Sequence, residues 1–408
     1  MDTQRFSIKG RVISGDEPLL QDALAQVHES SERPRCLCVP GGIEMYVARH
    51  RYFVVKRMPE TGSRHHPSCT SYEPDPASSG LGELVGNAVR ESQAGEVELC
   101  VDFPWTRTQG HGGSRTDAGL PGDVEAARRR ISLHGLIHFL FERAGFNRWT
   151  PAMEGKRNQG VLHKYLTEAA QEVHAKGVPL AQRLYVPEPF TEATHTAAAR
   201  RRRVKLEILR PIDGRSPLAL VLGEFKAVDT SASGHKVWIR HMPDAPLLVD
   251  SKTWKRIEKV FAALFEARDA DTGYRVRLVM AALIRARREH TYEIDAASLM
   301  LASEHWIPVE GVHELPLVHA LIEQRRRFVK PLRYDAHAAA RFPNAVLLDV
   351  GAAPLALHVF SPFMTPKDRE VKEAAVRACE RACERACDRV WVWPADEPVM
   401  PALPEASP

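Results

Sequence analysis

The chain has 408 residues, enough for roughly two or three domains with hydrophobic cores, and its apolar content of 44% is ordinary for a globular protein. A formal net charge of +4 excludes a polycation, although basic residues are grouped in places. No apolar run reaches the roughly 18 residues of a membrane span, and the N-terminal residues lack the apolar core of a secretion signal. We therefore expect a cytoplasmic protein with no membrane partner, whose seven cysteines are metal ligands or free thiols rather than disulfides.

The first predicted unit covers residues 1–75. Two β-rich runs, Ile43–Arg49 and Tyr52–Arg57, flank a tight connection at His50-Arg51, and this pattern predicts a β-hairpin. Residues 76–122 are rich in proline, glycine and serine, so the composition predicts a linker.

The middle of the chain is predicted to contain both helices and strands. Helical periodicity is the main signal in residues 123–180, and residues 181–305 are predicted to form a central α/β domain. An amphipathic helix is expected at Ser251–Ala267. The strands predicted in the central domain are Val204–Leu209, Leu218–Lys226, Lys236–Ile239, Tyr274–Ile284 and Thr291–Ala302.

Residues 306–394 are predicted to form a C-terminal α/β domain with the order helix, three strands, helix, strand. PD-(D/E)xK nucleases have a core of this order. Their catalytic positions correspond here to Pro343-Asn344 and His358-Val359-Phe360, and asparagine and histidine bind magnesium less well than carboxylates. The pattern favours a nuclease-like fold that has lost its chemistry, with an unrelated α/β domain as the alternative. Residues 395–408 are proline-rich and predicted to be disordered.

Three cysteines and two histidines near the N-terminus have the spacing of a zinc site. Cys36 and Cys38 form one close pair, and Cys69 follows His66 with the two-residue gap of a zinc knuckle. His65 would leave a three-residue gap and stays open as the fourth ligand. Because four protein ligands leave no open position, the zinc would be structural. The alternative is a set of buried thiols with surface histidines.

A second candidate site could hold magnesium. Glu224 and Lys226 lie two residues apart at the end of an apolar strand, so their side chains share one face, and Asp213 precedes Glu224 by ten intervening residues. In a nuclease the two acids would hold Mg²⁺ and the lysine would assist the attacking water. The alternative is an aspartate in a hairpin turn and a strand that reaches the surface.

Grouped basic residues indicate a nucleic-acid partner. Arg148 and the pair Lys156-Arg157 flank a turn between two predicted helices. A run of four arginines, Arg200, Arg201, Arg202 and Arg203, precedes a predicted strand. Each group alone is more often a solvated surface, but together they favour contact with phosphates. No pattern identifies a protein partner.

Several motifs together resemble one family. They are Cys36-Leu37-Cys38-Val39-Pro40-Gly41-Gly42, Val55-Lys56-Arg57-Met58-Pro59, His65-His66-Pro67-Ser68-Cys69, Ala144-Gly145-Phe146-Asn147-Arg148-Trp149, Gly155-Lys156-Arg157, Gly223-Glu224-Phe225-Lys226 and Phe328-Val329-Lys330-Pro331-Leu332-Arg333-Tyr334. On these motifs the chain resembles, from about residue 30 to 394, the bacterial family of domain of unknown function 1173. The resemblance implies a protein of integrative elements or conjugative plasmids, and it implies no assigned activity or site residues.

Together these patterns predict an α/β (α+β) protein with an N-terminal zinc-binding hairpin module. The expected function is that of a zinc-containing, nucleic-acid-associated protein of a bacterial mobile element, with metal-dependent nuclease activity as one form that it can take. The alternative is a non-catalytic scaffold that binds DNA or protein and contains a structural zinc. Zinc is the expected cofactor, and magnesium is expected only for a nuclease.

Overall fold

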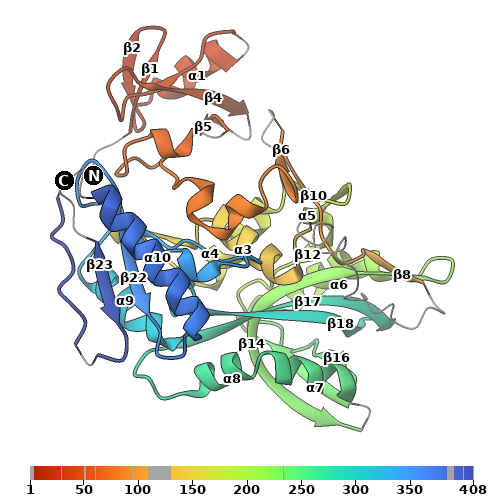
Figure 1. Cartoon of the computed structure of the whole chain (residues 1–408). Coiled ribbons are helices and arrows are strands. Elements are labelled where there is room, and N and C mark those ends of the chain that lie inside the picture. The colour runs from red at the N-terminus through yellow and green to blue at the C-terminus, as the bar shows by residue number, and fades with distance from the viewer. Residues whose placement is uncertain are drawn as a thin grey trace.

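Sheets and helices are both present along the whole chain and confirm a mixed α/β fold (Figure 1). The architecture comes from a computed structural model. The residues that it describes are 4–28, 30–49, 52–59, 61–92, 96–108, 130–232, 234–383, 390–397 and 399–407.

The N-terminal unit is an antiparallel sheet with helix α1 (Leu20–His28) packed on one face. Phe6, Leu24 and Met45 lie in its small core, because alternate residues of each strand point toward the helix. The sheet contains the predicted hairpin of β4 and β5, although the turn at His50-Arg51 lies outside the described residues. In sheet order the strands are β2 (Arg11–Ser14), β1 (Arg5–Ile8), β3 (Arg35–Cys36), β4 (Ile43–Arg49) and β5 (Phe53–Arg57).

The predicted linker is wrong for residues 76–92 and 96–108, which are folded; residues 93–95 and 109–129 lie outside the described part. The glycines here permit close packing rather than flexibility. A Cβ on Gly80 would lie 2.0 Å from the carbonyl oxygen of Arg333, and the Gly80 amide donates to Leu332 at 2.9 Å. The strands are β6 (Val89–Glu91), β7 (Val97–Leu99) and β8 (Thr106–Thr108), which join β10 (Val173–Ala175), β11 (Val178–Pro179) and β13 (Arg215–Pro217) in two small sheets.

Four helices come from the described residues of the next part of the chain: α3 (Leu133–Arg143), α4 (Gln159–Ala169), the short α5 (Leu180–Arg183) and α6 (His195–Leu206). The strand predicted at Val204–Leu209 is wrong, because this segment ends α6 and continues as a 3₁₀ turn. Arg202, Leu206 and Leu209 are buried at spacings of four and three residues, which is the helical period.

Five strands of the central region form a closed barrel. In the order around the ring they are β14 (Ala219–Ser231), β15 (Gly234–Ile239), β16 (Leu247–Val249), β18 (Thr291–Ser303) and β17 (Val276–Arg288). Strand β17 pairs back onto the first half of β14 and closes the ring. Only the β16–β18 pair is parallel, and helices α7 (Ser251–Val260) and α8 (Ala262–Asp269) connect β16 to β17.

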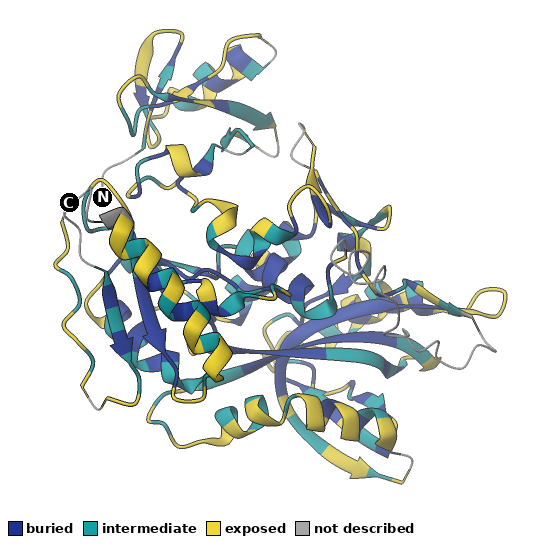
Figure 2. Cartoon of the chain, in the orientation of Figure 1, coloured by how far each residue is buried: buried dark blue, intermediate teal, exposed yellow. Residues whose placement is uncertain are grey.

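The wall of the barrel is covered unevenly. In the first half of β14, Val221 points into the barrel, while Leu220 and Leu222 point outward and pack in a second core together with α3 and α4. The second half of β14 and β15 bury only their inner face, and their outer face meets solvent (Figure 2). We call this exposed part, residues 226–231 with β15, the open wall.

The C-terminal region adds a sheet to the same core, and Phe328 and Leu357 belong to one cluster with the barrel interior. Strand β9 (Arg148–Trp149) forms one edge of the sheet, so this region is not separate from the preceding chain. Its other elements are α9 (Leu315–Glu323), β20 (Phe328–Val329), β21 (Ala345–Leu347), β22 (Leu355–Phe360), α10 (Pro366–Cys383) and β23 (Trp391–Pro394).

The disordered tail predicted at residues 395–408 is wrong for the described part, 395–397 and 399–407. The amide of Ser407 donates to Asp349 at 2.7 Å, and the Trp391 indole donates to the Ala402 carbonyl at 3.1 Å. Met400 and Leu403 pack against the core, so the proline-rich composition here gives an extended, docked segment.

A buried polar cluster joins α10 to the C-terminal sheet. Glu314 pairs with Lys330 at 2.7 Å, and the Asn344 side chain donates to Glu314 at 2.5 Å. Lys372 on α10 is completely buried and donates to the Asn344 side chain and to the Phe342 carbonyl, both at 2.7 Å. Asn344 thus has a role in the buried polar packing of this region.

The burial of Lys372 predicts a pH-dependent stability. Burial lowers the pKa of Lys372 to about 7, so above that pH the folded chain lacks a proton that the unfolded chain keeps up to about 10.5. The free energy of unfolding therefore rises from pH 7 toward 10.5, by at most about 1.4 kcal/mol per pH unit. Urea titrations at pH 7 and 9 should show that the free energy of unfolding of wild type, relative to that of Lys372→Met, is higher at pH 9. The exposed Lys367→Met is the control, and a wild-type advantage that does not change with pH contradicts the prediction.

Candidate functional site

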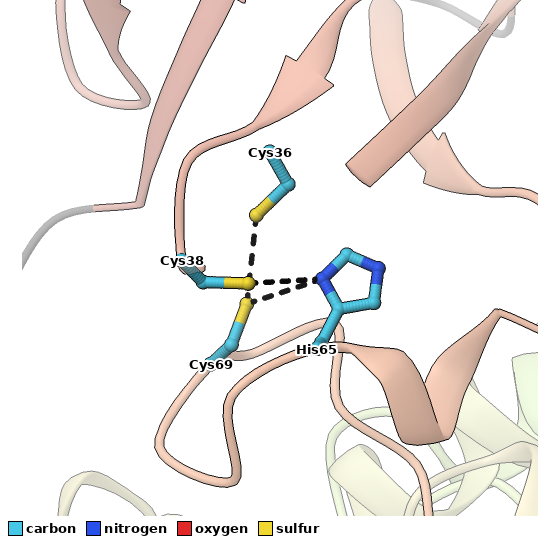
Figure 3. A group of neighbouring side chains, drawn as sticks. All are labelled: Cys36, Cys38, His65 and Cys69. Carbon is cyan, nitrogen blue, oxygen red and sulfur yellow. Dashed lines mark hydrogen bonds between the residues drawn. The ribbon is translucent and has the colours of Figure 1, made fainter. Parts of the chain in front are cut away.

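Two turns of the N-terminal unit bring four metal-ligating side chains together (Figure 3). Cys36 ends β3, and Cys38 follows in a turn that Gly42 closes with a positive φ of 66°. His65 follows a 3₁₀ turn, and Cys69 lies in the next turn, where its amide donates to the His66 carbonyl at 2.8 Å. The hairpin β4–β5 connects the two turns, as the sequence pattern predicts.

The spacing of the four ligand atoms fits a tetrahedral metal ion. All four atoms lie within 4.8 Å of one another. Cys36 Sγ is 3.7 Å from Cys69 Sγ, and His65 Nδ1 is 3.3 Å from Cys38 Sγ and 3.8 Å from Cys69 Sγ. With metal–sulfur bonds of about 2.3 Å, the edge of a tetrahedron is about 3.8 Å. The donor set therefore suits a soft or borderline divalent metal and leaves no position for substrate.

In the structure His65, and not His66, is the fourth member of the metal-ligating group. His65 is 2% exposed, and its Nδ1 faces the thiols. His66 lies outside the group, and its Nδ1 contacts the Ser68 hydroxyl at 2.7 Å. The sequence could not decide this point, since both spacings occur in metal sites and only the direction of each ring separates them.

Hydrogen bonds among the ligands shift the pKa values of the cysteine thiols. The Cys69 thiol and the Gln4 side-chain amide both donate to Cys36 and lower the pKa of Cys36 to about 4. The same hydrogen bond raises the pKa of Cys69, so one thiolate stands beside protonated thiols until a cation displaces their protons.

The metal-binding turn also seats the N-terminal unit on the C-terminal sheet. Cys69 and Tyr72 pack against Val329 and Val346 of β20 and β21. Arg327 donates to the Ser68 carbonyl at 2.5 Å. A metal that fixes this turn therefore also stabilises an interface between distant parts of the chain.

In the second predicted site, Glu224 is already used in ion pairs. Glu224 is 5% exposed, and its two carboxylate oxygens pair with Arg240 at 2.9 Å and Arg277 at 2.8 Å. Asp213 lies in a left-handed turn with φ of 48°, before the start of β14. Because two guanidinium groups neutralise the Glu224 carboxylate, its neighbours do not support a magnesium ion there.

Lys226 is separated from that ion-pair cluster. It is exposed at the irregularity where the register between β14 and β15 shifts, between Phe225 and Ala227. The side chain lies on the open wall. Its assignment to a catalytic site therefore has no support from its neighbours.

Arg148 and Arg157 donate to backbone carbonyls of the chain, so both guanidinium groups are already used in the fold. Arg148 donates to the Tyr72 carbonyl. Arg157 donates to the carbonyls of Gly145 and Phe146, both at 3.0 Å, and to that of Arg148. Its guanidinium lies 5.3 Å from the ring centres of both Phe146 and Trp149. Burial lowers the pKa of Arg157 to about 10, which leaves it charged at neutral pH.

The remaining predicted basic residues divide into paired and exposed ones. On α6, Arg201 pairs with Glu188, and the buried Arg202 pairs with Asp244. Arg200 and Arg203 on the same helix, and Lys156 in the loop before α4, are exposed. Of the four arginines, Arg202 is thus buried, Arg201 is exposed but paired, and only Arg200 and Arg203 are exposed without an ion pair among the described residues.

Helix α7 has a basic surface that is not visible as a run of consecutive basic residues in the sequence. At 100° per residue its four cations fall within a sector of about 100°, opposite the buried Trp254 and Ile257. All four side chains are exposed, and no ion pair to them occurs among the described residues. The helical spacing was the available signal. We call this set the basic stripe, and its members are Lys252, Lys255, Arg256 and Lys259.

These features define a mixed α/β protein whose described residues include one N-terminal Cys/His group that could hold a metal ion. The family described as "Protein of unknown function (DUF1173)" matches residues 6–395, and the chain belongs to this family. No curated protein and no solved structure matches the chain significantly. Within the described residues, no helix combines the length and apolar character needed to cross a bilayer.

Substitutions of neighbouring residues should separate metal ligands from bystanders. Cys69→Ser and His65→Ala remove a ligand and should weaken metal binding by at least about 100-fold. His66→Ala and the exposed Cys100→Ser should keep one metal ion per chain. Elemental analysis after chelator competition measures this. Equal metal content in His65→Ala and His66→Ala would contradict the assignment of His65.

Arg157 should matter for stability in a way that its neighbour does not. Arg157→Met leaves buried carbonyl groups without a donor and should lower the free energy of unfolding by roughly 2–3 kcal/mol. The exposed Lys156→Met should stay within about 0.5 kcal/mol of wild type. Urea titration measures both, and equal effects would mean that Arg157 does not support its loop.

Proposed function

We propose that the chain is a nucleic-acid-binding protein with a structural zinc ion and no cleavage site of its own at Glu224. The observation that carries this proposal is the basic stripe of α7, where four exposed cations share one helix face without acidic partners among the described residues. Such a surface suits a polyanion, because each phosphate contact releases bound counterions.

The basic stripe lies on a helix that is capped and packed against the barrel. Asp250 caps the helix by accepting from the amides of Lys252 and Thr253, both at 2.9 Å. On the opposite side, Trp254 stacks with Phe225 of the barrel at a ring distance of 6.3 Å. The cations therefore project from a helix that is anchored to the barrel, which lowers the entropy cost of binding.

The strand connectivity of the barrel supports the same proposal. Strands one, two and three in chain order are neighbours, the fifth lies between the third and the fourth, and a helical segment precedes the fourth. OB-folds are small Greek-key barrels of this kind, and many of them bind oligonucleotides on the face of their second and third strands. The fold alone does not establish function, so the charge and exposure of specific residues carry more weight.

Zinc is the metal that we propose for the Cys36, Cys38, His65 and Cys69 centre. Three thiolates and one imidazole are a common set for structural zinc, and four protein ligands exclude a catalytic water. A cytoplasmic setting suits this centre, because thiols stay reduced there. A place on a bacterial mobile element stays a prediction.

The experiment that tests the proposal is neutralisation of the basic stripe. A variant with Lys252, Lys255, Arg256 and Lys259 changed to glutamine should bind a labelled oligonucleotide more weakly. With four phosphate contacts removed, the slope of log K against log salt concentration should fall by about 3. Fluorescence anisotropy at several salt concentrations measures it.

The control replaces four exposed cations elsewhere by glutamine, so that net charge changes equally. Lys9, Arg11, Arg90 and Lys367 serve this purpose. An equal loss of oligonucleotide affinity in both variants would mean that net charge alone accounts for binding, and it would contradict a specific binding surface on α7. Magnesium-dependent cleavage that survives Glu224→Gln would show a nuclease site elsewhere in the chain.

A further inference from the structure

The open wall carries an aromatic side chain between basic ones. By register, Ala227 of β14 lies opposite Trp238 of β15, and Asp229 lies opposite Lys236. Alternate residues of β15, Val237 and Ile239, belong to the barrel core. Trp238 and Lys236 therefore point outward, together with Asp229.

Trp238 is held in a fixed orientation with one ring face uncovered by its cross-strand neighbour. The indole Nε1 donates to the Asp229 carboxylate at 2.6 Å, which draws the ring along the sheet surface. Directly opposite stands Ala227, whose methyl group is too small to cover an indole. Trp238 is half-buried, whereas every tryptophan in the hydrophobic cores is almost completely buried. A core role does not account for its position.

Two cations flank this ring on the open wall. Lys226 and Lys236 are exposed there, and no ion pair to either occurs in the described part of the chain. Helix α7 packs on the other face of the same hairpin, since its Trp254 ring contacts His235 at 5.9 Å, and His235 alternates with the outward Lys236. The basic stripe faces away from Trp254 and is therefore a surface separate from the wall cations.

We propose that the open wall binds single-stranded nucleic acid, with one base stacked on Trp238 and the flanking phosphates on Lys226 and Lys236. This inference rests on the proposed function and names the form of its ligand. Stacking requires a base whose face is free, and in a duplex each base face is covered by its neighbour. The grouped lysines favour a polyanion over a neutral oligosaccharide, the other ligand class of such barrels.

The test compares Trp238→Ala and Trp238→Phe with wild type on three labelled 20-mers: oligo-dT, oligo-rU and a duplex. Loss of the stacked ring should weaken single-strand binding by roughly tenfold or more in the alanine variant, and the phenylalanine variant should recover most of it. Duplex affinity should change less than threefold. The ratio of dT to rU affinity tells DNA from RNA.

Tyr165→Ala is the matched control, because Tyr165 is an aromatic residue, 43% exposed, on α4 away from the wall. It should leave single-strand affinity unchanged. Should Trp238→Ala fail to fold, photocrosslinking of a bromouridine-substituted strand to wild type keeps the test open. The crosslink is expected in the peptide that contains Trp238.

The outcomes separate the two proposals. Equal single-strand affinity in Trp238→Ala and wild type, or a crosslink only elsewhere, overturns the stacking site while the basic stripe can still bind. Tight binding to the duplex alone overturns the single-strand inference and leaves the proposed function in place. Failure of wild type to bind any of the three ligands overturns both.

Discussion

The fold depends on the change of pairing partner along strand β14. Up to Glu224 the strand pairs with β17, and from Phe225 onward it pairs with β15. Glu224 stands at this point, and its buried carboxylate bridges Arg240, which follows β15, and Arg277 on β17. A buried carboxylate with two guanidinium partners costs several kcal/mol to break by removing one partner. The ion-pair cluster thus fixes the place where the barrel closes.

The same junction separates the part of β14 that is buried on both faces from the part whose outer face is exposed to solvent. Before it, β14 has apolar residues on both faces, since α3 and α4 cover the outer one. After it, only one face is apolar and the other meets solvent. Lys226 is the second residue past the junction, and it is exposed although it lies two positions from the buried Glu224. The motif Glu224-Phe225-Lys226 therefore spans the boundary between a structural ion pair and an open surface.

The metal-ligand set was predictable because it depends on local chemistry. Two short cysteine and histidine groups joined by a hairpin determine a ligand set without knowledge of the rest of the chain. The strands Leu218–Lys226 and Lys236–Ile239 were predictable for a similar reason, since β-branched and apolar residues alternate or run together there. Closure of the barrel was not, because β14 and β17 pair across more than fifty residues of intervening chain.

The incorrect predictions have one physical cause: composition does not show which distant residues a side chain contacts in the folded chain. Arg202 and Arg157 look like surface cations in the sequence, yet one is buried with Asp244 and the other holds backbone carbonyls. Proline and glycine near Gly80 look like a linker, yet they permit contact with Arg333. In each case the deciding group lies far away in sequence, so only the folded chain shows whether a charge or a glycine is already used.

The metal centre and the basic surfaces lie at opposite ends of the molecule. The N-terminal unit is at the top of Figure 1, whereas α7 and α8 are at the bottom. A metal held by Cys69 would fix a turn that rests on β20 and β21, and the basic stripe is anchored on the barrel through Trp254. Both anchor points belong to elements that share one hydrophobic core or pack directly on it. A contribution of the metal to nucleic-acid binding would therefore have to act through the stability of this core, since no metal ligand is near the open wall.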